Sequence, residues 1–167
     1  HNPSSSRNVD MPLSALTRET LRMIDVVMSM VVQTADMFDM EKEDAERIQE
    51  VRRLDDRVDT LYNAVSRYAI HLVRSDMAKA DKTRVNALLR YSASLENAGD
   101  IVDKSLLDIA KYKARAKSRF STEGHNELSE LFLYVPATMQ MAAEATMGWR
   151  ADSAELLLER KAVFKKK

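Results

Sequence analysis

Two stretches of the chain place apolar residues at steps of three and four over many turns, the pattern of helices that bury one face. The first seam consists of Ile48, Val51, Asp55, Val58, Tyr62, Val65, Ala69 and Leu72. The second consists of Val85, Leu88, Ser92, Leu95, Gly99, Val102, Leu106 and Ile109. The segment SDMAKADK between them is short, so the two helices are predicted to lie side by side and antiparallel.

Residues that break helices are scarce in the rest of the chain. The 167 residues include only three Gly and three Pro, and strong helix formers fill long stretches. The sequence therefore predicts an all-α fold. Its length suits one domain with a substantial core, or two small bundles side by side.

Four long helices and the start of a fifth are predicted. They cover Leu13–Asp39, Ala45–Arg74, Asp81–Lys117 and Asn126–Trp149, and the fifth begins in RADSAELLLERKAVFKKK. Asp81 suits the N-cap of the third helix, and Pro136 is expected to kink the fourth. The first three helices are predicted to form an antiparallel three-helix bundle.

Composition excludes several classes of function. Lys plus Arg and Asp plus Glu each total 26, so no broad electrostatic attraction to nucleic acid is expected. The absence of cysteine excludes thiolate metal sites, disulfides and thiol nucleophiles. No apolar run approaches the roughly 20 residues of a membrane span. The polar opening HNPSSSRN suggests a tag or linker, so we expect a fragment of a longer protein.

Five carboxylates are predicted to gather where the two seams meet. Asp55 lies on the first seam and Asp59 one turn beyond it, while Glu96, Asp100 and Asp103 flank the second seam. The residue numbers of Asp55 and Asp100 add to the same total as those of Asp59 and Glu96. If the two helices are antiparallel, Asp55 therefore lies level with Asp100, and Asp59 lies level with Glu96. Both pairs are roughly 28–34 Å from the turn.

Buried carboxylates need positive charge beside them, because an unpaired one costs several kcal/mol. With no Cys or His nearby in sequence, a metal would meet only oxygen ligands, which suits magnesium, calcium, manganese or iron. The alternative is an ordinary solvated face in which Arg52, Arg53 and Arg57 pair with the acids.

Two enzyme interpretations of the acidic residues are weaker. DDRVD matches the DDxxD string of isoprenoid synthases, but those enzymes need a larger helical shell and a second metal motif of different composition. An all-α, magnesium-dependent nucleotide pyrophosphatase also uses acidic pairs on two helices, generally with ExxE and ExxD spacings. The spacing of four in this chain differs from that pattern.

The motifs resemble those of the PhoU family. SLENAGDIVDKSLLDIAKYK is similar to the third-helix motif of that family, and LDDRVDTL to its second-helix motif. MPLSALTRETLRMIDVVMSM looks like the start of the PhoU-like region of bacterial sodium–phosphate cotransporter-family proteins. Asn97 and Ala98 stand where the family usually has Arg-Ile.

The resemblance implies two three-helix bundles related by a repeat, with metal held by acidic motifs. It assigns residues 11–117 to the first bundle and 118–167 to an incomplete second repeat, after the expected tag or linker of residues 1–10. By resemblance, the metal ligands are Asp55, Asp59, Glu96, Asp100 and Asp103. Iron is the implied metal, with manganese, magnesium or calcium as alternatives.

The function implied is regulatory and not enzymatic, on the cytoplasmic face of the membrane. The implied partner is a phosphate transporter's membrane domain in the same polypeptide, and self-association is a further expectation. A helical interaction scaffold without metal remains an alternative. The basic segment KYKARAKSR suits either anionic lipid or a solvated helix end. His71 and His125 belong to no constellation, and the ten Met residues are expected mainly to fill the core.

Overall fold

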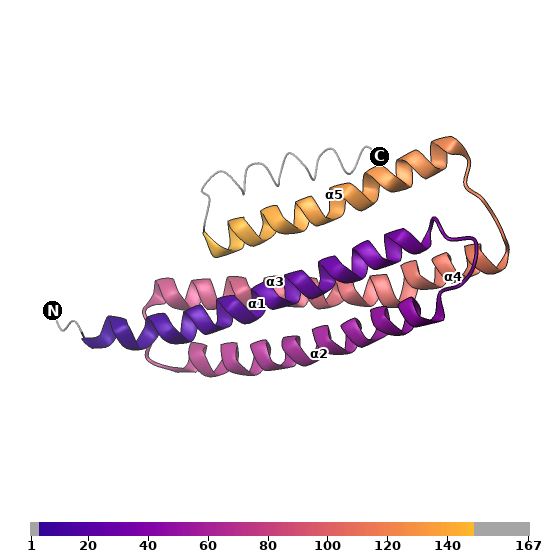
Figure 1. Ribbon diagram of the computed structural model, residues 1–167. Coiled ribbons are helices and arrows are strands. Elements are labelled where there is room, and N and C mark those ends of the chain that lie inside the picture. Colours follow the sequence, from indigo (N-terminus) through magenta and orange to yellow (C-terminus); the bar gives the residue numbers. More distant parts are fainter. Residues whose placement is uncertain (1–3, 149–167) are drawn as a thin grey trace.

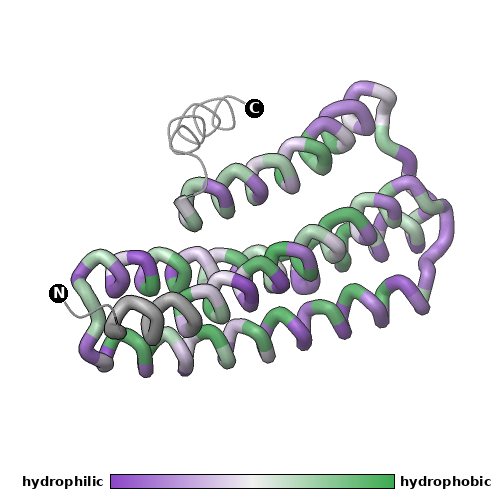
Figure 2. The backbone as a smooth tube through the Cα atoms, turned by 60° about the vertical axis from the view of Figure 1, so that its left-hand side comes forward, coloured by the Kyte–Doolittle hydropathy of each residue, from purple (hydrophilic) through white to green (hydrophobic). Residues whose placement is uncertain are grey.

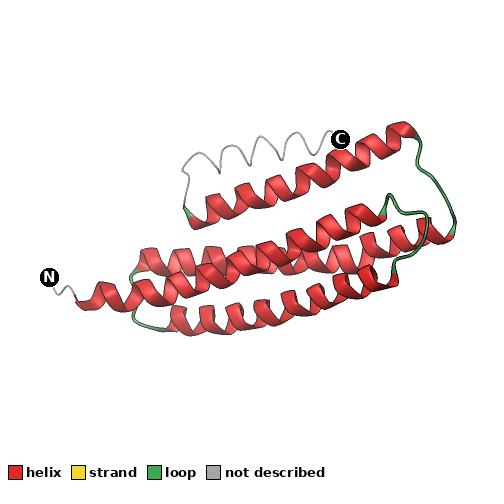
Figure 3. Cartoon of the chain, viewed as in Figure 1, coloured by secondary structure: helices red, strands yellow, loops and turns green. Residues whose placement is uncertain are grey.

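The fold is a bundle of long antiparallel helices. The computed structural model describes the backbone of residues 4–148 and the side chains of residues 12–148. Its elements are α1 (Ser4–Met37), α2 (Ala45–Arg74), α3 (Lys79–Ile101), the π-helical turn η1 (Val102–Leu106), α4 (Leu107–Arg115) and α5 (Thr122–Met147). Residues 4–148 contain no strand, as Figure 3 shows, so the predicted all-α class is confirmed.

The first three rods lie side by side and run up, down and up. α1 and α2 pack against the rod formed by α3, η1 and α4, which we call the third rod (Figure 1). α5 runs antiparallel to α1 and packs on α1 and α3, on the side of α1 away from α2. The predicted three-helix bundle is therefore present, with a fourth helix added to it.

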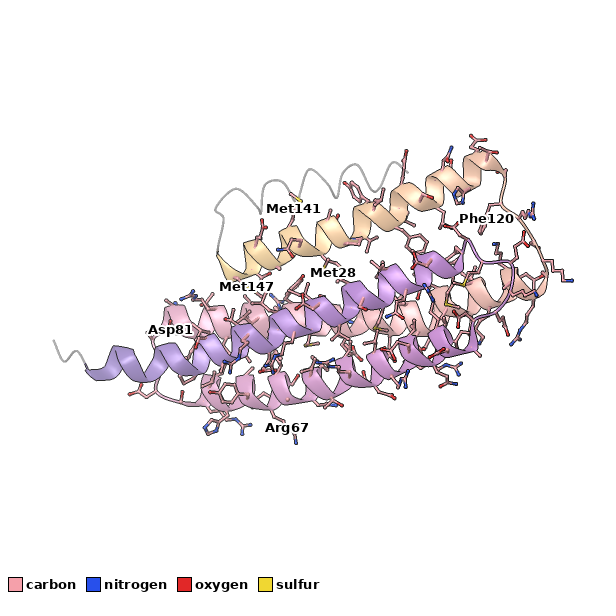
Figure 4. The ribbon with its side chains drawn as sticks, viewed as in Figure 1. Met28, Arg67, Asp81, Phe120, Met141 and Met147 are labelled. Carbon is pink, nitrogen blue, oxygen red and sulfur yellow. The ribbon has the colours of Figure 1, made fainter. Side chains whose placement is uncertain are left out.

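The core lies between the rods. Hydrophobic and hydrophilic residues alternate along each of them (Figure 2). Met23, Val27 and Met30 of α1 are completely buried, as are Val51 and Val58 of α2. Five of the methionines are buried in this core, Met23, Met30, Met37, Met77 and Met147, which agrees with their predicted role. Met28 of α1 is only half-buried at the edge of the core (Figure 4).

α2 agrees with the sequence prediction in both its bounds and its buried face. It spans Ala45–Arg74, and the Asp44 carboxylate caps it by accepting a 3.0 Å bond from the backbone N–H of Arg47. Seven of the eight seam residues are buried, including Asp55, and Tyr62 is half-buried against the core. The spacing of three and four therefore predicted the buried face correctly along the whole of α2.

The third rod agrees with its predicted seam only as far as Val102. Beyond it, Leu106 is half-buried and Ile109 is 52% exposed, while Leu107, Ala110 and Ala114 are buried. The cause is η1, because a π turn contains one residue more than an α turn and rotates everything after it. The predictions for Leu106 and Ile109 were therefore wrong by one position.

Several predicted helix ends also differ. α1 begins at Ser4, within the segment predicted to be a linker, and contains Pro12. Asp81 lies in the first turn of α3, and Ala78, without a side-chain bond, is its N-cap. Pro136 lies inside α5, which begins at Thr122 after the capping Ser121. The predicted fifth helix lies outside the described residues.

Hydropathy gives no membrane span in the described part of the chain. None of the helices there combines the length and the apolar character that crossing a bilayer requires.

Candidate functional site

An aspartate is buried in the middle of the α2 seam. Asp55 lies one turn from Val51 and Val58, and only 7% of its surface is exposed. Its Oδ1 atom accepts no hydrogen bond. Buried polar atoms almost always have a partner, so this unpaired oxygen makes Asp55 a candidate for binding a further group. Asp59, one turn along α2, is exposed to solvent.

A glycine on α3 makes room for this carboxylate. Gly99 is buried, and a Cβ atom added to it would lie 3.2 Å from Asp55 Oδ1 and 3.6 Å from Val58 Cγ1. The α3 backbone therefore lies directly against the acid. This contact confirms the predicted register, in which Asp55 and Asp100 share one height.

The π turn supplies a second buried acidic oxygen. Asp103 belongs to η1, its side chain is 20% exposed, and its Oδ1 atom also accepts no hydrogen bond. The nearest cation is Arg52, whose Nε lies 4.0 Å from that oxygen, which is an ion pair but too long for a hydrogen bond. α2 and η1 thus each contribute a carboxylate oxygen without a hydrogen-bond donor.

Burial and neighbouring charge both disfavour ionisation of Asp55. Its pKa is raised from 3.8 to about 6, first by burial and then by the charges of Asp103, Asp59 and Asp100. Lys104 acts in the opposite direction and lowers this pKa. We call Asp55, Asp59, Asp100 and Asp103 the acidic cluster, since the charges of the other three act on Asp55.

The cluster carries its own cations, as the cost of buried acids requires. The Lys104 ammonium lies 2.5 Å from Asp100 Oδ1, and its pKa is raised chiefly by that hydrogen bond. Arg53, one of the predicted partners, instead pairs with Glu50 at 2.6 Å. Lys104 was missed from the sequence, although its spacing of four from Asp100 is the usual signal for a helical ion pair.

Glu96 is half-buried on α3, and it is not among the charges with the largest effect on the pKa of Asp55. Of the five predicted residues, three thus act on a fourth, Asp55.

The donor atoms of the cluster suit a hard cation, but they do not form a preassembled metal centre. In residues 12–148, no three His, Asp or Glu side chains are arranged to hold an ion. The oxygens of Asp55 and Asp103 fit the chemistry of a cation that prefers oxygen ligands. Completing a coordination shell would require side-chain rotation and release of Asp100 from Lys104.

The histidines described by the structure lie elsewhere. His71 is exposed near the end of α2, and His125 is exposed with its Nδ1 atom 3.4 Å from Asp39 Oδ1. Neither reaches the acidic cluster.

Comparison with known proteins places the chain in a family. It is 28% identical over 160 residues to the "Putative inorganic phosphate export protein YjbB" of Escherichia coli (strain K12). The same identity holds for the protein of that name from Escherichia coli O157:H7, and 27% for that of Salmonella typhimurium. The match covers 94% of this chain but only 29% of these relatives, so the chain spans under a third of their length.

No solved structure matches the chain. The PhoU domain, as a family, matches residues 20–109, which run from the second half of α1 through all of α2, α3 and η1 into α4. This range contains every member of the acidic cluster. The chain therefore belongs to the PhoU family.

Proposed function

We propose that this domain regulates phosphate transport and that it does so by binding a metal ion at the acidic cluster. Asp55, Asp59, Asp100 and Asp103 would hold the ion, together with Glu96 of α3. Iron is the first candidate, and manganese, magnesium and calcium are the others. The role is regulatory and not catalytic.

One observation carries the metal proposal. Asp55 is 7% exposed, its Oδ1 atom has no hydrogen-bond partner, and three further carboxylates act on it. Leaving such a group ionised without a cation is costly, and a metal ion would neutralise it. The local cations are mostly in solvent, since the side chains of Lys104 and Arg52 are 64% and 49% exposed. They compensate the cluster only partly.

The transport proposal rests on the relatives. The proteins named for phosphate export are more than three times as long as the matched segment, so this domain corresponds to a part of each. We propose that the domain works on the cytoplasmic face of the membrane, next to a phosphate-transporting membrane domain of the sodium–phosphate cotransporter type in the same polypeptide. Self-association through the surface of the bundle belongs to the same proposal.

Metal content tests the site directly. The wild type, Asp55→Asn and Asp103→Asn would be dialysed without chelator and measured by elemental mass spectrometry. Asp56→Asn is the matched control, because Asp56 neighbours Asp55 on α2 but is exposed. We expect metal in the wild type and in the control and its loss in the other two. A wild type that stays empty after titration with iron, manganese, magnesium and calcium contradicts the proposal.

The regulatory role needs the full-length protein. Phosphate flux would be measured in vesicles that contain it, with metal present and after chelation, for the wild type and Asp55→Asn. A flux that responds to metal in the wild type alone supports the proposal, and equal flux in all samples contradicts it. Incubation with magnesium and nucleoside triphosphates should release no pyrophosphate, which separates this role from that of a nucleotide pyrophosphatase.

A further inference from the structure

A pocket rich in cations lies at the end of the bundle where α1 turns into α2 and α4 into α5. Its volume is about 280 Å³, and it is lined by Glu41, Lys42, Lys113, Lys117, Ser118 and Arg119. Four of these six side chains are cationic and one is a carboxylate. The pocket therefore has a local excess of positive charge, although the whole chain has no net charge.

Lys113 fixes one wall of the pocket. Its ammonium donates 2.7 Å and 3.1 Å hydrogen bonds to the carbonyl oxygens of Phe38 and Met40, just beyond the end of α1. It also lies 5.9 Å from the ring of Phe120, in the segment between α4 and α5 (Figure 4). The Lys113 charge near the C-terminal end of α1 interacts favourably with the negative end of the helix dipole and so weakens its repulsion of an anion.

Two cations of the pocket remain available. Arg119 pairs with Glu41, whereas Lys42 and Lys117 make no ion pair anywhere in residues 12–148. The backbone offers no further donors next to Lys117. The N–H groups of Lys117 and Ser118 are bonded to the carbonyl oxygens of Ala114 and Lys113. At these two residues an anion would therefore meet only side-chain donors.

We propose that this pocket binds a phosphate group, either as inorganic phosphate or as the headgroup of an anionic lipid. Lys42 and Lys117 supply point charges, and Arg119 supplies a planar fork that fits phosphate oxygens once it leaves Glu41. The pocket is large enough for a phosphate ion with bound water. It is independent of the acidic cluster, because Asp55 lies about 15 Å further along α2 than Ala45.

Titration with inorganic phosphate tests the first source. Amide NMR spectra of the isotope-labelled domain would be followed at constant ionic strength, with chloride as the control titrant. We expect saturable shifts at Lys42, Lys117, Ser118 and Arg119 with phosphate, and none with chloride. Equal responses to both salts would overturn specific binding of free phosphate.

Charge-removing variants show which side chains hold the anion. Lys42→Gln with Lys117→Asn removes both free charges, and Asn suits the left-handed φ of 50° at position 117. Phosphate affinity should fall about tenfold, the size expected for two partly exposed contacts. Lys79→Gln is the control, since Lys79 is an exposed lysine at the start of α3, at the other end of the bundle. An equal loss in the control contradicts the proposal.

Glu41 provides a test of opposite sign. Glu41→Gln frees Arg119 and removes the one carboxylate of the pocket, so phosphate should bind several times more tightly. A purely structural role for these charges predicts no gain. A lower affinity in this variant contradicts the proposed arrangement.

Vesicles distinguish the two sources of phosphate. Sedimentation would compare phosphatidylcholine vesicles with mixed phosphatidylcholine–phosphatidylglycerol vesicles, for the wild type and for the Lys42 and Lys117 double variant. Binding to mixed vesicles that the double variant loses assigns the pocket to lipid. Phosphate-dependent shifts without vesicle binding assign it to free phosphate. If neither ligand binds, the proposal is wrong.

Discussion

α2 and the third rod contribute equally to the acidic cluster but reach it in different ways. α2 keeps steps of three and four from Ile48 to Leu72, and Asp55 simply occupies one of its core positions. The third rod keeps the same spacing as far as Val102. The turn η1 then adds one residue, so that Leu107 occupies the next core position. The acids thus lie on a regular helix on one side and at a break in periodicity on the other.

The difference has a functional consequence. A π turn interrupts the regular α-helix, and such turns are frequent at functional sites. In this chain the turn carries both Asp103, with its unpaired buried oxygen, and Lys104, the ammonium nearest to Asp100. The comparison predicts that the regular spacing of α2 is needed mainly for packing of the core, whereas the π turn η1 is needed mainly for the geometry of the acidic cluster.

The strongest test deletes one exposed residue from each rod. Deletion of Arg57 rotates the rest of α2 by about 100° and turns Val58, Val65 and Leu72 out of the core. Each buried side chain of this kind is worth about 1.5–3 kcal/mol, so the loss approaches the whole stability of a domain. We expect no cooperative thermal transition by circular dichroism.

Deletion of Ser105 is the matched experiment in η1. Removing this exposed residue gives Val102 and Leu107 the ordinary spacing of four, so the core positions after the turn are kept. We expect a folded protein with unchanged or higher thermal stability and weaker metal binding. Unfolding of this variant would show that the π turn is needed for packing. The third rod would then not differ from α2 in this respect.

The second test removes the buried charge from α2. With a pKa of about 6 when folded and 3.8 when unfolded, the ionised Asp55 costs about 3 kcal/mol at neutral pH in the metal-free protein. Asp55→Asn should therefore raise the free energy of unfolding by up to that amount. Chemical denaturation in the presence of chelator measures it.

The pH dependence checks the sign of this effect. Below about pH 4 both states of Asp55 are protonated, so the variant should gain little there. The gain should grow as the pH rises from 4 to 6 and stay constant above that range. Asp56→Asn should show no such profile. A gain that is independent of pH would show that the stabilisation does not come from removing the Asp55 charge.

The third test concerns the contact between the rods. Gly99→Ala gains about 1 kcal/mol of helix propensity but brings a methyl group to 3.2 Å from Asp55 Oδ1. In the wild type the two effects should nearly cancel. In the Asp55→Ala background the clash is gone, so the same substitution should stabilise by about 1 kcal/mol. Equal effects in both backgrounds would mean that the close approach has no energetic weight.

Regular periodicity explains what the sequence predicted correctly. The bounds of α2, its buried face and the height of Asp55 relative to Asp100 all follow from constant steps along two helices. The resemblance of the acidic motifs to PhoU sequences agreed with the family match over residues 20–109.

The π turn was not predictable by the same reasoning. After Val102, either of two sets of apolar residues could continue the buried face: Leu106 and Ile109, or Leu107, Ala110 and Ala114. Only the packing of the third rod against α1 and α2 determines which set is buried. The start of α1 was missed because a polar segment containing Pro12 gives no seam. Lys104 was overlooked because the predicted cations were all arginines of α2, although Asp100 and Lys104 are one turn apart in the sequence.

The smallest test asks whether Lys104 of η1 occupies the place of a metal ion. It lowers the pKa of Asp55, and its hydrogen bond to Asp100 holds one of the carboxylates that a metal would need. Lys104→Gln should therefore raise the pKa of Asp55 further, by a fraction of a unit, as followed by carboxyl carbon NMR without metal. The same variant should bind metal several times more tightly, because the competing ammonium is gone. Lys111→Gln, which breaks the pair of Lys111 with the exposed Asp108 on α4, should change neither quantity. Weaker metal binding in Lys104→Gln would mean that the lysine organises the cluster for the ion instead of competing with it.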